Sequence, residues 1–431
     1  MKTGMKQRIE QIRHVKVPEG YVWHRPYTIP MDWDVVKLGD ITECVSRPNR
    51  DGKDRPAYSI SNQKGFVPQS EQFEEGSYQD LDKTAYKIVL PGEFAYNPAR
   101  INVGSIGRLK DEREVIVSSL YVCIQTNDRV YGEFFDAWTK SLDFYKEVIR
   151  NTEGSVREYL FYENFSNIRM PLPPIDEQRR IVEVLAACDR VIELKQKLVD
   201  ELKKLKKVCL AKMFPQEGET VPEIRFPGFT APWGHRTLAS LCKLFIDGDW
   251  IESKDQSDSG IRLIQTGNIG VGEFLDKPDN RKWISYETFY RLHCNEVLPG
   301  DILISRLPDP AGRACIIPYL GAKMITAVDC TIIRTASDVN NSFLIQYLST
   351  KEYFDAVNTC LAGGTRQRIS RSNLAKLCVP IPSEREEQGV IGSYFSTIDT
   401  LIALHQRELE NEQRKKKALM QLLLTGIVRT I

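Results

Sequence analysis

The longest amphipathic pattern in the chain runs from Pro171 to Phe214. Prolines open this stretch, and no glycine or proline follows Pro174 before Phe214, as expected for one long helix. Apolar residues recur at alternating three- and four-residue steps, interrupted once at Lys195, which predicts a single apolar seam. The seam residues are Ile181, Val184, Cys188, Val191, Leu198, Leu202, Leu205 and Cys209.

The same pattern returns in altered form from Pro380. PLPPIDEQRRI in the first copy matches PIPSEREEQGVI in the second, and after a slip of one residue Gln178 corresponds to Gln388 and Asp189 to Asp399. The second seam is interrupted by a polar patch at 410–417, and it consists of Ile391, Phe395, Ile398, Ile402 and Leu409. We expect the two seams to pair with each other. The alternatives are a long amphipathic helix on a compact core, or a homo-oligomeric coiled coil.

The repeat extends beyond the two helices. VLPGEFAYN from Val89 matches VLPGDILIS from Val297, and each reads as an apolar strand interrupted by a Pro-Gly turn. Trp33 corresponds to Trp233, and a glycine-marked loop precedes each long helix, GSVREYLFYENF from Gly154 and GGTRQRISRSNL from Gly363. Strand-like and helix-like segments alternate in both halves, which indicates a mixed α/β (α+β) fold with an internal pseudo-two-fold repeat.

This repeat predicts the domain organisation. We expect a first globular domain at 1–170, a central helix at 171–214, a second globular domain at 215–379 and a C-terminal helix at 380–431. Short connections require the helices to run antiparallel, with one globular domain at each end of a helix pair roughly 50 Å long. Two domains related by a two-fold axis match the symmetry of a DNA duplex, which makes DNA the expected ligand.

Composition narrows the class of protein. The chain has 431 residues, 42% of them apolar and 27% charged, with a net charge of +1, which is typical of globular proteins with two or three domains. We expect neither a signal peptide nor a membrane span, because no window approaches 18 uncharged apolar residues. Ten scattered cysteines without a CxxC pair indicate reduced thiols, as in the cytoplasm.

Catalytic motifs are missing from the sequence. There is no GxxxxGK[ST] phosphate loop, and the five histidines have no HExxH spacing, so we expect no metal site. The run from Asn97 to Arg100 lacks the second proline and the aromatic residue of an adenine methylase motif. We therefore expect a binding module without catalytic residues of its own. The alternative is the specificity part of a methylase or nuclease that acts alone.

The order of these motifs identifies a family. With its doubled helices, LPGDILISR from Leu298, AYNPARINVGSIG from Ala95 and the loop from Gly363, the chain resembles the specificity subunit of prokaryotic type I restriction-modification systems along essentially its whole length. The resemblance implies two target recognition domains, each reading half of a bipartite, asymmetric DNA site. It also implies that the helices set the spacer and recruit two methylase subunits. S-adenosylmethionine, ATP and Mg²⁺ are then expected on partner subunits, including restriction subunits, and no cofactor on this chain.

Candidate DNA contacts follow from side-chain chemistry, because Lys and Arg neutralise phosphates while Arg, Asn and Gln read base edges. In the second half they are Arg366, Gln367, Arg368, Arg371, Arg306 and Asn268. In the first half they are Arg100, Asn102, Arg157, Asn62 and Lys64; here the glycine loop departs from the arginine-rich form usual in the family.

The first long helix carries a separate charge signal. From Arg179 to Lys212 it has ten basic and five acidic residues, a net charge of +5. This charge suits a DNA spacer or a partner subunit, or it marks a solvated helix face.

Overall fold

The computed structural model describes residues 2–14, 16–72, 83–152, 159–308, 310–363 and 367–430. The chain divides into two compact units. Unit 1 consists of Met1–Leu194 and Glu408–Ile431, and unit 2 of Lys195–Arg407. The two long helices are α6 (Ile175–Lys212) and α11 (Arg385–Leu424). Each unit therefore contains part of both helices.

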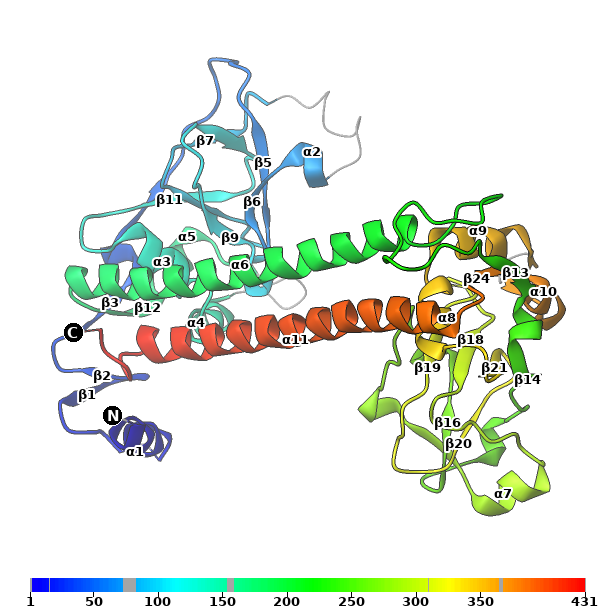
Figure 1. Ribbon diagram of the computed structural model, residues 1–431. Helices are drawn as coiled ribbons and strands as arrows, with labels where there is room; N and C mark the ends of the chain where they lie inside the picture. Colours follow the sequence, from blue (N-terminus) through cyan, green and yellow to red (C-terminus); the bar gives the residue numbers. More distant parts are fainter. Residues whose placement is uncertain are drawn as a thin grey trace. The chain divides into compact units, whose positions relative to one another are not determined.

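Unit 1 is built from small, mainly antiparallel sheets covered by short helices (Figure 1). The first four-stranded sheet has the order β4-β11-β8-β9, made of β4 (Thr42–Val45), β11 (Val122–Thr126), β8 (Phe94–Tyr96) and β9 (Ile106–Arg108). The second has the order β6-β5-β10-β7, made of β6 (Gly65–Pro68), β5 (Ala57–Ser61), β10 (Val115–Val117) and β7 (Lys87–Val89), with β5 and β10 parallel. Two-stranded sheets pair β1 (Tyr21–His24) with β2 (Tyr27–Pro30) and β3 (Asp34–Lys37) with β12 (Arg169–Leu172). The helices are α1 (Lys2–Arg13), α2 (Gln69–Gln72), α3 (Gly132–Trp138), α4 (Leu142–Asn151) and α5 (Tyr162–Phe165).

Unit 2 repeats this plan. Its first sheet has the order β14-β21-β18-β19, made of β14 (Cys242–Asp247), β21 (Cys330–Thr335), β18 (Ile302–Ser305) and β19 (Ala314–Ile316). The second has the order β15-β17-β16-β20, made of β15 (Gln256–Ser257), β17 (Lys282–Ile284), β16 (Ile261–Ile264) and β20 (Met324–Thr326), with β16 and β20 parallel. Two-stranded sheets pair β13 (Gly234–Thr237) with β24 (Cys378–Ile381) and β22 (Leu361–Ala362) with β23 (Arg368–Ile369). The helices are α7 (Tyr286–Arg291), α8 (Asn341–Tyr347), α9 (Lys351–Thr359) and α10 (Arg371–Lys376).

The corresponding sheets confirm the predicted mixed α/β fold with an internal repeat. Strands β4, β11, β8 and β9 occupy the same order as β14, β21, β18 and β19, and each unit has one parallel pair in its second sheet. The predicted Pro-Gly turns precede β8 and β18, where Gly92 and Gly300 have φ angles of 87° and 93°. Glycine adopts this left-handed conformation without steric cost, so both turns require it.

Within each unit the segments of α6 and α11 run antiparallel. In unit 1, Asp189 of α6 pairs with Lys416 of α11, and Ile181 shares a buried core with Leu423. In unit 2, Lys206 Nζ lies 2.6 Å from Asp399 Oδ1, and Met213 shares a core with Phe395. Figure 1 shows the start of α6 beside the red end of α11 in unit 1.

The predicted seam on α6 is wrong in its phase. Val191, Leu198 and Leu205 are 44%, 42% and 46% exposed, whereas Leu185 and Val199 are buried. From Ile181 the inward positions follow four- and then three-residue steps, not three and then four; they are Leu185, Cys188, Ile192, Lys195, Val199, Leu202, Lys206, Cys209 and Met213. Lys195 and Lys206 lie on this inward face, so the alternative face contains more apolar residues in the sequence. The ion pair with Asp399 is the reason that Lys206 is tolerated there.

The remaining seam residues lie as follows. On α6, Ile181 and Cys209 are buried, Val184 packs against the unit 1 core, and Cys188 and Leu202 are half-buried. On α11, Ile391, Phe395 and Ile398 belong to the unit 2 core, Ile402 packs against it, and Leu409 is buried.

Reversing the charge of Lys206 tests the seam ion pairs. Lys206→Glu places a second acid against Asp399, which also accepts a hydrogen bond from Gln346 at 3.0 Å. We expect unit 2 to lose about 1 kcal/mol of unfolding free energy, because the pair is only partly buried. Adding Asp399→Lys restores most of the loss. Denaturant unfolding of the single and double variants measures both changes, and a double variant no better than the single one contradicts the pairing.

A Glu-Gln pair fixes the start of each long helix. Trp33 Nε1 donates to Glu177 Oε2 at 2.9 Å in unit 1, and Trp233 Nε1 donates to Glu387 Oε1 at 3.2 Å in unit 2. The neighbouring glutamine accepts a hydrogen bond from a backbone N–H of the same unit. Gln178 accepts one at 2.7 Å in unit 1, and Gln388 accepts one at 2.8 Å in unit 2. The repeated Trp and Glu-Gln residues thus dock each helix start onto its own globular unit.

An arginine completes each of these buried contacts. Arg429, after the end of α11, places Nε and Nη2 2.7 Å from the two carboxylate oxygens of Glu177. Arg225, after the end of α6, contacts both oxygens of Glu387 at 2.7 and 2.8 Å. The segment following each long helix therefore closes the unit in which the other long helix begins.

Acid is expected to weaken unit 1 through Glu177. Burial alone raises the pKa of Glu177, but the hydrogen bonds from Arg429 and Trp33 and the charge of Arg429 hold that pKa below its ordinary value. Because the folded-state pKa is depressed, the stabilisation is complete above the unfolded-state pKa of about 4.3 and is lost as the pH falls through the folded-state pKa. Denaturant unfolding of unit 1 from about pH 5 to about pH 3 measures this loss. Glu177→Gln serves as the control and is expected to flatten the pH dependence.

Candidate nucleic-acid interface

The two units share a backbone arrangement at the predicted DNA-contact loops, which we call the loop frame. In unit 2 it joins the turn 306–313, between β18 and β19, to the segment just before α10, where Ile369 N donates to Arg306 O at 3.2 Å. In unit 1 the equivalent bond runs from Leu160 N to Pro98 O at 3.0 Å. Each unit thus brings the segment just before α5 or α10 against the turn that follows β8 or β18.

Two predicted arginines of unit 2 lie at this frame with exposed side chains. The side chains of Arg368 and Arg371 are 61% and 50% exposed, and Gln367 is exposed beside them. Arg368 Nη1 lies 3.7 Å from Asp329 Oδ1, and Arg371 Nε lies 3.9 Å from Asp247 Oδ2. Arg366 lies outside the described residues. The arrangement places two accessible guanidinium groups on one edge of unit 2.

Two predicted contacts of unit 2 instead hold the fold together. Arg306 is 8% exposed, and its Nη2 donates to Val328 O at 2.5 Å. Asn268 is 6% exposed; its Oδ1 accepts from Gln265 N at 3.0 Å and its Nδ2 donates to Leu275 O at 2.9 Å. A role as direct DNA contacts therefore does not fit either residue, because their polar groups face inward.

Two of the five candidates of unit 1, Asn62 and Asn102, line a cavity of about 440 Å³. Tyr145 and Lys140 line it as well. Arg100 is exposed just before Asn102 in the same turn, and Lys64 is exposed and lines a neighbouring cavity. Arg157 lies outside the described residues. Amide groups, an aromatic ring and basic side chains thus occur together here, as base and phosphate recognition require.

Sequence reasoning missed an aromatic pair in unit 1. Tyr159 and Phe161 flank the buried Leu160, and their rings stack with centroids 5.6 Å apart and an interplanar angle of 4°. Phe161 is 58% exposed. The positions equivalent to these two in the loop frame of unit 2 hold Arg368 and Ser370. Alternating aromatic residues around a buried leucine are the only sequence signal for this feature.

Sequence reasoning also missed Arg313, which shapes the turn that contains Arg306 in unit 2. Arg313 donates to the carbonyl oxygens of Ile269, Leu307 and Pro308 at 2.8, 2.9 and 2.8 Å. These bonds fix the turn that contains Arg306. Its sequence signal, one arginine after a Pro-Ala-Gly run, does not distinguish it from a surface residue.

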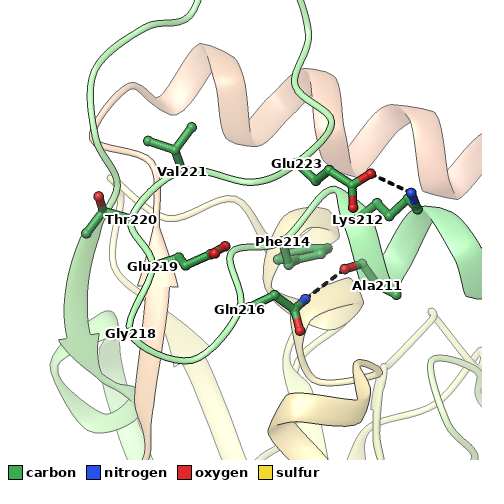
Figure 2. Close-up of a pocket in the computed structure, with 9 residues that line it drawn as sticks. All are labelled: Ala211, Lys212, Phe214, Gln216, Gly218, Glu219, Thr220, Val221 and Glu223. Carbon is green, nitrogen blue, oxygen red and sulfur yellow. Dashed lines mark hydrogen bonds and ion pairs between the residues drawn. The ribbon is translucent and has the colours of Figure 1, made fainter.

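A cavity of about 880 Å³ lies elsewhere, in the segment after α6 (Figure 2). Glu219, Glu223 and Phe214 are among the residues that line it. Lys212 Nζ pairs with Glu223 at 2.5 Å, and Gln216 donates to Ala211 O at 2.8 Å. With its one lysine already paired and two carboxylates on its wall, this cavity repels phosphate.

The basic stretch of α6 also borders a cavity within unit 2. Lys203, Lys206 and Lys207 line a space of about 420 Å³ together with Lys351 of α9 and apolar side chains such as Phe354. Lys206 forms an ion pair with Asp399.

Among the described parts of the chain, no helix combines the length and hydrophobicity needed to cross a bilayer.

A mixed α/β unit occurs twice in this chain, and each copy holds one loop frame and the start of one long helix, which defines the class of the fold. The family model described as type I restriction modification DNA specificity domain matches residues 30–204 and 231–412, and the chain belongs to this family.

Curated relatives match over nearly their full length. The MjaVIII type I restriction enzyme specificity subunit of Methanocaldococcus jannaschii is 24% identical over 429 residues, covering 93% of this chain and 94% of the relative. A putative MjaX specificity subunit of the same organism is also 24% identical, over 430 residues, covering 93% and 95% of the two chains.

Solved structures share the fold. A chain from a study of complex assembly and conformational transition of the type I R-M system superposes with a TM-score of 0.59 at 20% identity, covering 94% of this chain and all of that one. The type I restriction-modification S subunit from M. genitalium gives a TM-score of 0.52 at 11% identity, covering 93% and 97%.

Proposed function

We propose that this chain is the DNA specificity subunit of a type I restriction-modification complex, and that each unit recognises one half of a bipartite site in duplex DNA. The observation that carries the proposal is the loop frame. It occurs in both units with the same backbone hydrogen bond but different side chains, Pro98, Tyr159 and Phe161 in one and Arg306, Arg368 and Ser370 in the other. Equal scaffolds with unequal loops suit an asymmetric site.

The chemistry of recognition divides between phosphates and bases. Exposed cations such as Lys64, Arg100 and Arg368 neutralise phosphates, which supplies salt-dependent affinity without sequence preference. Amides such as Asn62, and arginines held in one orientation, read base edges in the grooves. Affinity and specificity therefore reside in different side chains of the same loops.

The long helices and the partner subunits complete the proposal. The helices set the spacer between the half-sites and recruit two methylase subunits. S-adenosylmethionine binds those methylase subunits, and ATP and Mg²⁺ are expected on partner subunits, with the ATP used by the restriction subunits. This chain then contributes specificity and no catalytic residue. Purified chain with S-adenosylmethionine and DNA is then expected to transfer no methyl group until a methylase subunit is added.

Methylome sequencing tests the function directly. We expect a host that expresses this chain with its neighbouring methylase subunit to methylate adenine at one split motif, with two different half-sites. A host with the methylase subunit alone serves as the control and is expected to lack that methylation. Identical methylomes in the two hosts contradict the proposal.

A further inference from the structure

Four side chains from separate elements of unit 2 converge at the loop frame. Asp247 ends β14 and lies opposite Thr331 of β21 in the strand register. Arg306 follows the last residue of β18, and Arg371 is the first residue of α10. The ends of three strands and the start of one helix therefore place one carboxylate, one hydroxyl and two guanidinium groups together.

Asp247 is held from three sides. Its Oδ1 accepts a hydrogen bond from Thr331 Oγ1 at 3.0 Å. Its Oδ2 lies 3.4 Å from Arg306 Nη2 and 3.9 Å from Arg371 Nε. The Asp247 side chain is 24% exposed, that of Arg306 9% and that of Arg371 50%. The acid thus stands between a buried arginine, which acts as its internal counterion, and an arginine that faces solvent.

The contact with Arg371 biases its orientation. The closest approach of Arg371 to Asp247 is through Nε, at 3.9 Å, an ion-pair distance longer than a hydrogen bond. A guanidinium group offers parallel donors in a rigid fork, and an acid beside its Nε edge favours orientations in which the terminal nitrogens point away from the acid. Such a fork matches the O6 and N7 acceptors of guanine in the major groove.

Arg368 provides the contrast. It is more exposed than Arg371, and its ion pair joins a terminal nitrogen, Nη1, to Asp329 at 3.7 Å. An arginine whose terminal nitrogen already faces an acid has fewer donors left for a base edge, and it suits a phosphate better, because a phosphate accepts donors from many directions. The two exposed arginines therefore differ in the kind of DNA contact that they can make.

We propose that Arg371 reads a guanine in the half-site bound by unit 2, and that Asp247, fixed by Thr331 and Arg306, is the positioning residue that orients it. This inference rests on the proposed function and adds a specificity-determining pair to it. Unit 1 lacks the set, because Pro98 stands at the position of Arg306 and Tyr162 at that of Arg371 in the loop frame. The guanine contact belongs to one half-site alone.

The test is selection from a randomised duplex pool by the chain in complex with its methylase subunits, followed by affinity measurements on the selected site and its single-base variants. Arg371→Ala is expected to weaken binding to the selected site about 10-fold or more and to erase the preference for guanine at one position. Asp247→Asn is expected to relax preference at the same position while its binding to mismatched duplexes stays unchanged. In the Arg371→Ala background, Asp247→Asn is expected to add nothing.

Controls separate positioning from folding. Asp338→Asn removes another Asp–Arg ion pair of unit 2, with Arg236 Nη1 at 2.5 Å, and is expected to leave selection unchanged. Asp247→Glu keeps the carboxylate and is expected to restore part of the guanine preference. Thermal unfolding of each variant checks that unit 2 remains folded.

Two results overturn the inference. If Asp247→Asn weakens binding to all duplexes equally, Arg371 contacts a phosphate. If Asp247→Asn further weakens DNA binding by the Arg371→Ala protein, the acid acts elsewhere. If the unmodified complex selects no sequence at all, the proposed function fails. If it selects a site that both Arg371→Ala and Asp247→Asn read unchanged, only the arginine assignment fails.

Discussion

Replacing Arg429 with alanine lowers the stability of unit 1 by about 3 kcal/mol and leaves unit 2 unchanged. The side chain of Glu177 is 1% exposed and that of Arg429 is 16% exposed. Removing the arginine leaves a buried carboxylate whose remaining hydrogen-bond donors, such as Trp33 Nε1, carry no charge. An unpaired buried charge costs far more than the loss of an exposed ion pair.

The repeat supplies a matched variant for this prediction. Arg225→Ala is expected to destabilise unit 2 in the same way, because the side chain of Glu387 is 2% exposed and that of Arg225 is 11% exposed. Hydrogen exchange followed by mass spectrometry reports on the two units separately. We expect faster exchange around Trp33 in the Arg429 variant and around Trp233 in the Arg225 variant. Equal effects of either variant on both units contradict this assignment.

Replacing Gly392 with alanine destabilises unit 2 by about 2 kcal/mol, although alanine is the better helix former. Gly392 lies within α11, and a Cβ there would stand 2.8 Å from Phe343 N and 2.9 Å from Ser342 C. Both atoms belong to the backbone of α8, which cannot move aside as a flexible side chain does. Close packing of the helix against α8 therefore outweighs the gain of about 1 kcal/mol from helix propensity.

Gly389 is the control for this prediction. It lies one turn earlier on α11, and the nearest atom to an added Cβ is Asn340 Nδ2 at 3.9 Å. Gly389→Ala is expected to stabilise unit 2 by about 0.5 to 1 kcal/mol. Denaturant unfolding measures both variants. Stabilisation by alanine at both positions shows that α8 does not approach α11 as closely as described.

The sequence was informative about the repeat because matched residues make matched contacts. Trp33 and Trp233 corresponded in sequence, and both bond to the glutamate at a helix start. Asp189 and Asp399 corresponded as well, and each pairs with a lysine of the other long helix. Residues that make the same contact in both units therefore recur at corresponding positions in the sequence.

The phase of the α6 seam was hidden for a physical reason. Apolar residues stand next to one another along this helix, as where Leu198 precedes Val199, so two neighbouring faces are both apolar enough to be buried. Only the partner helix decides between the two faces. The deciding residue, Lys206, is polar, and only its ion pair with Asp399 of α11 explains its place on the inward face.

The contact loops were the least predictable part. Arg306 and Asn268 lie in the expected loops, but their side chains turn inward to carbonyl groups contributed by residues distant in sequence or by the loop's own turns. Arg371 kept its exposure, and the acid beside it, Asp247, comes from a strand far earlier in the chain. Single-residue chemistry does not reveal which arginine faces a carbonyl and which faces solvent.

Unit 1 is completed by residues that the ribosome adds after all of unit 2. Leu423 and Leu424 join its core, and Arg429 neutralises its buried Glu177. During synthesis the first unit therefore waits with the apolar face around Ile181 and Leu185 uncovered until the last long helix emerges. The nascent chain therefore presents this apolar face to chaperones and proteases, and a translation product interrupted before that helix is incomplete in both units.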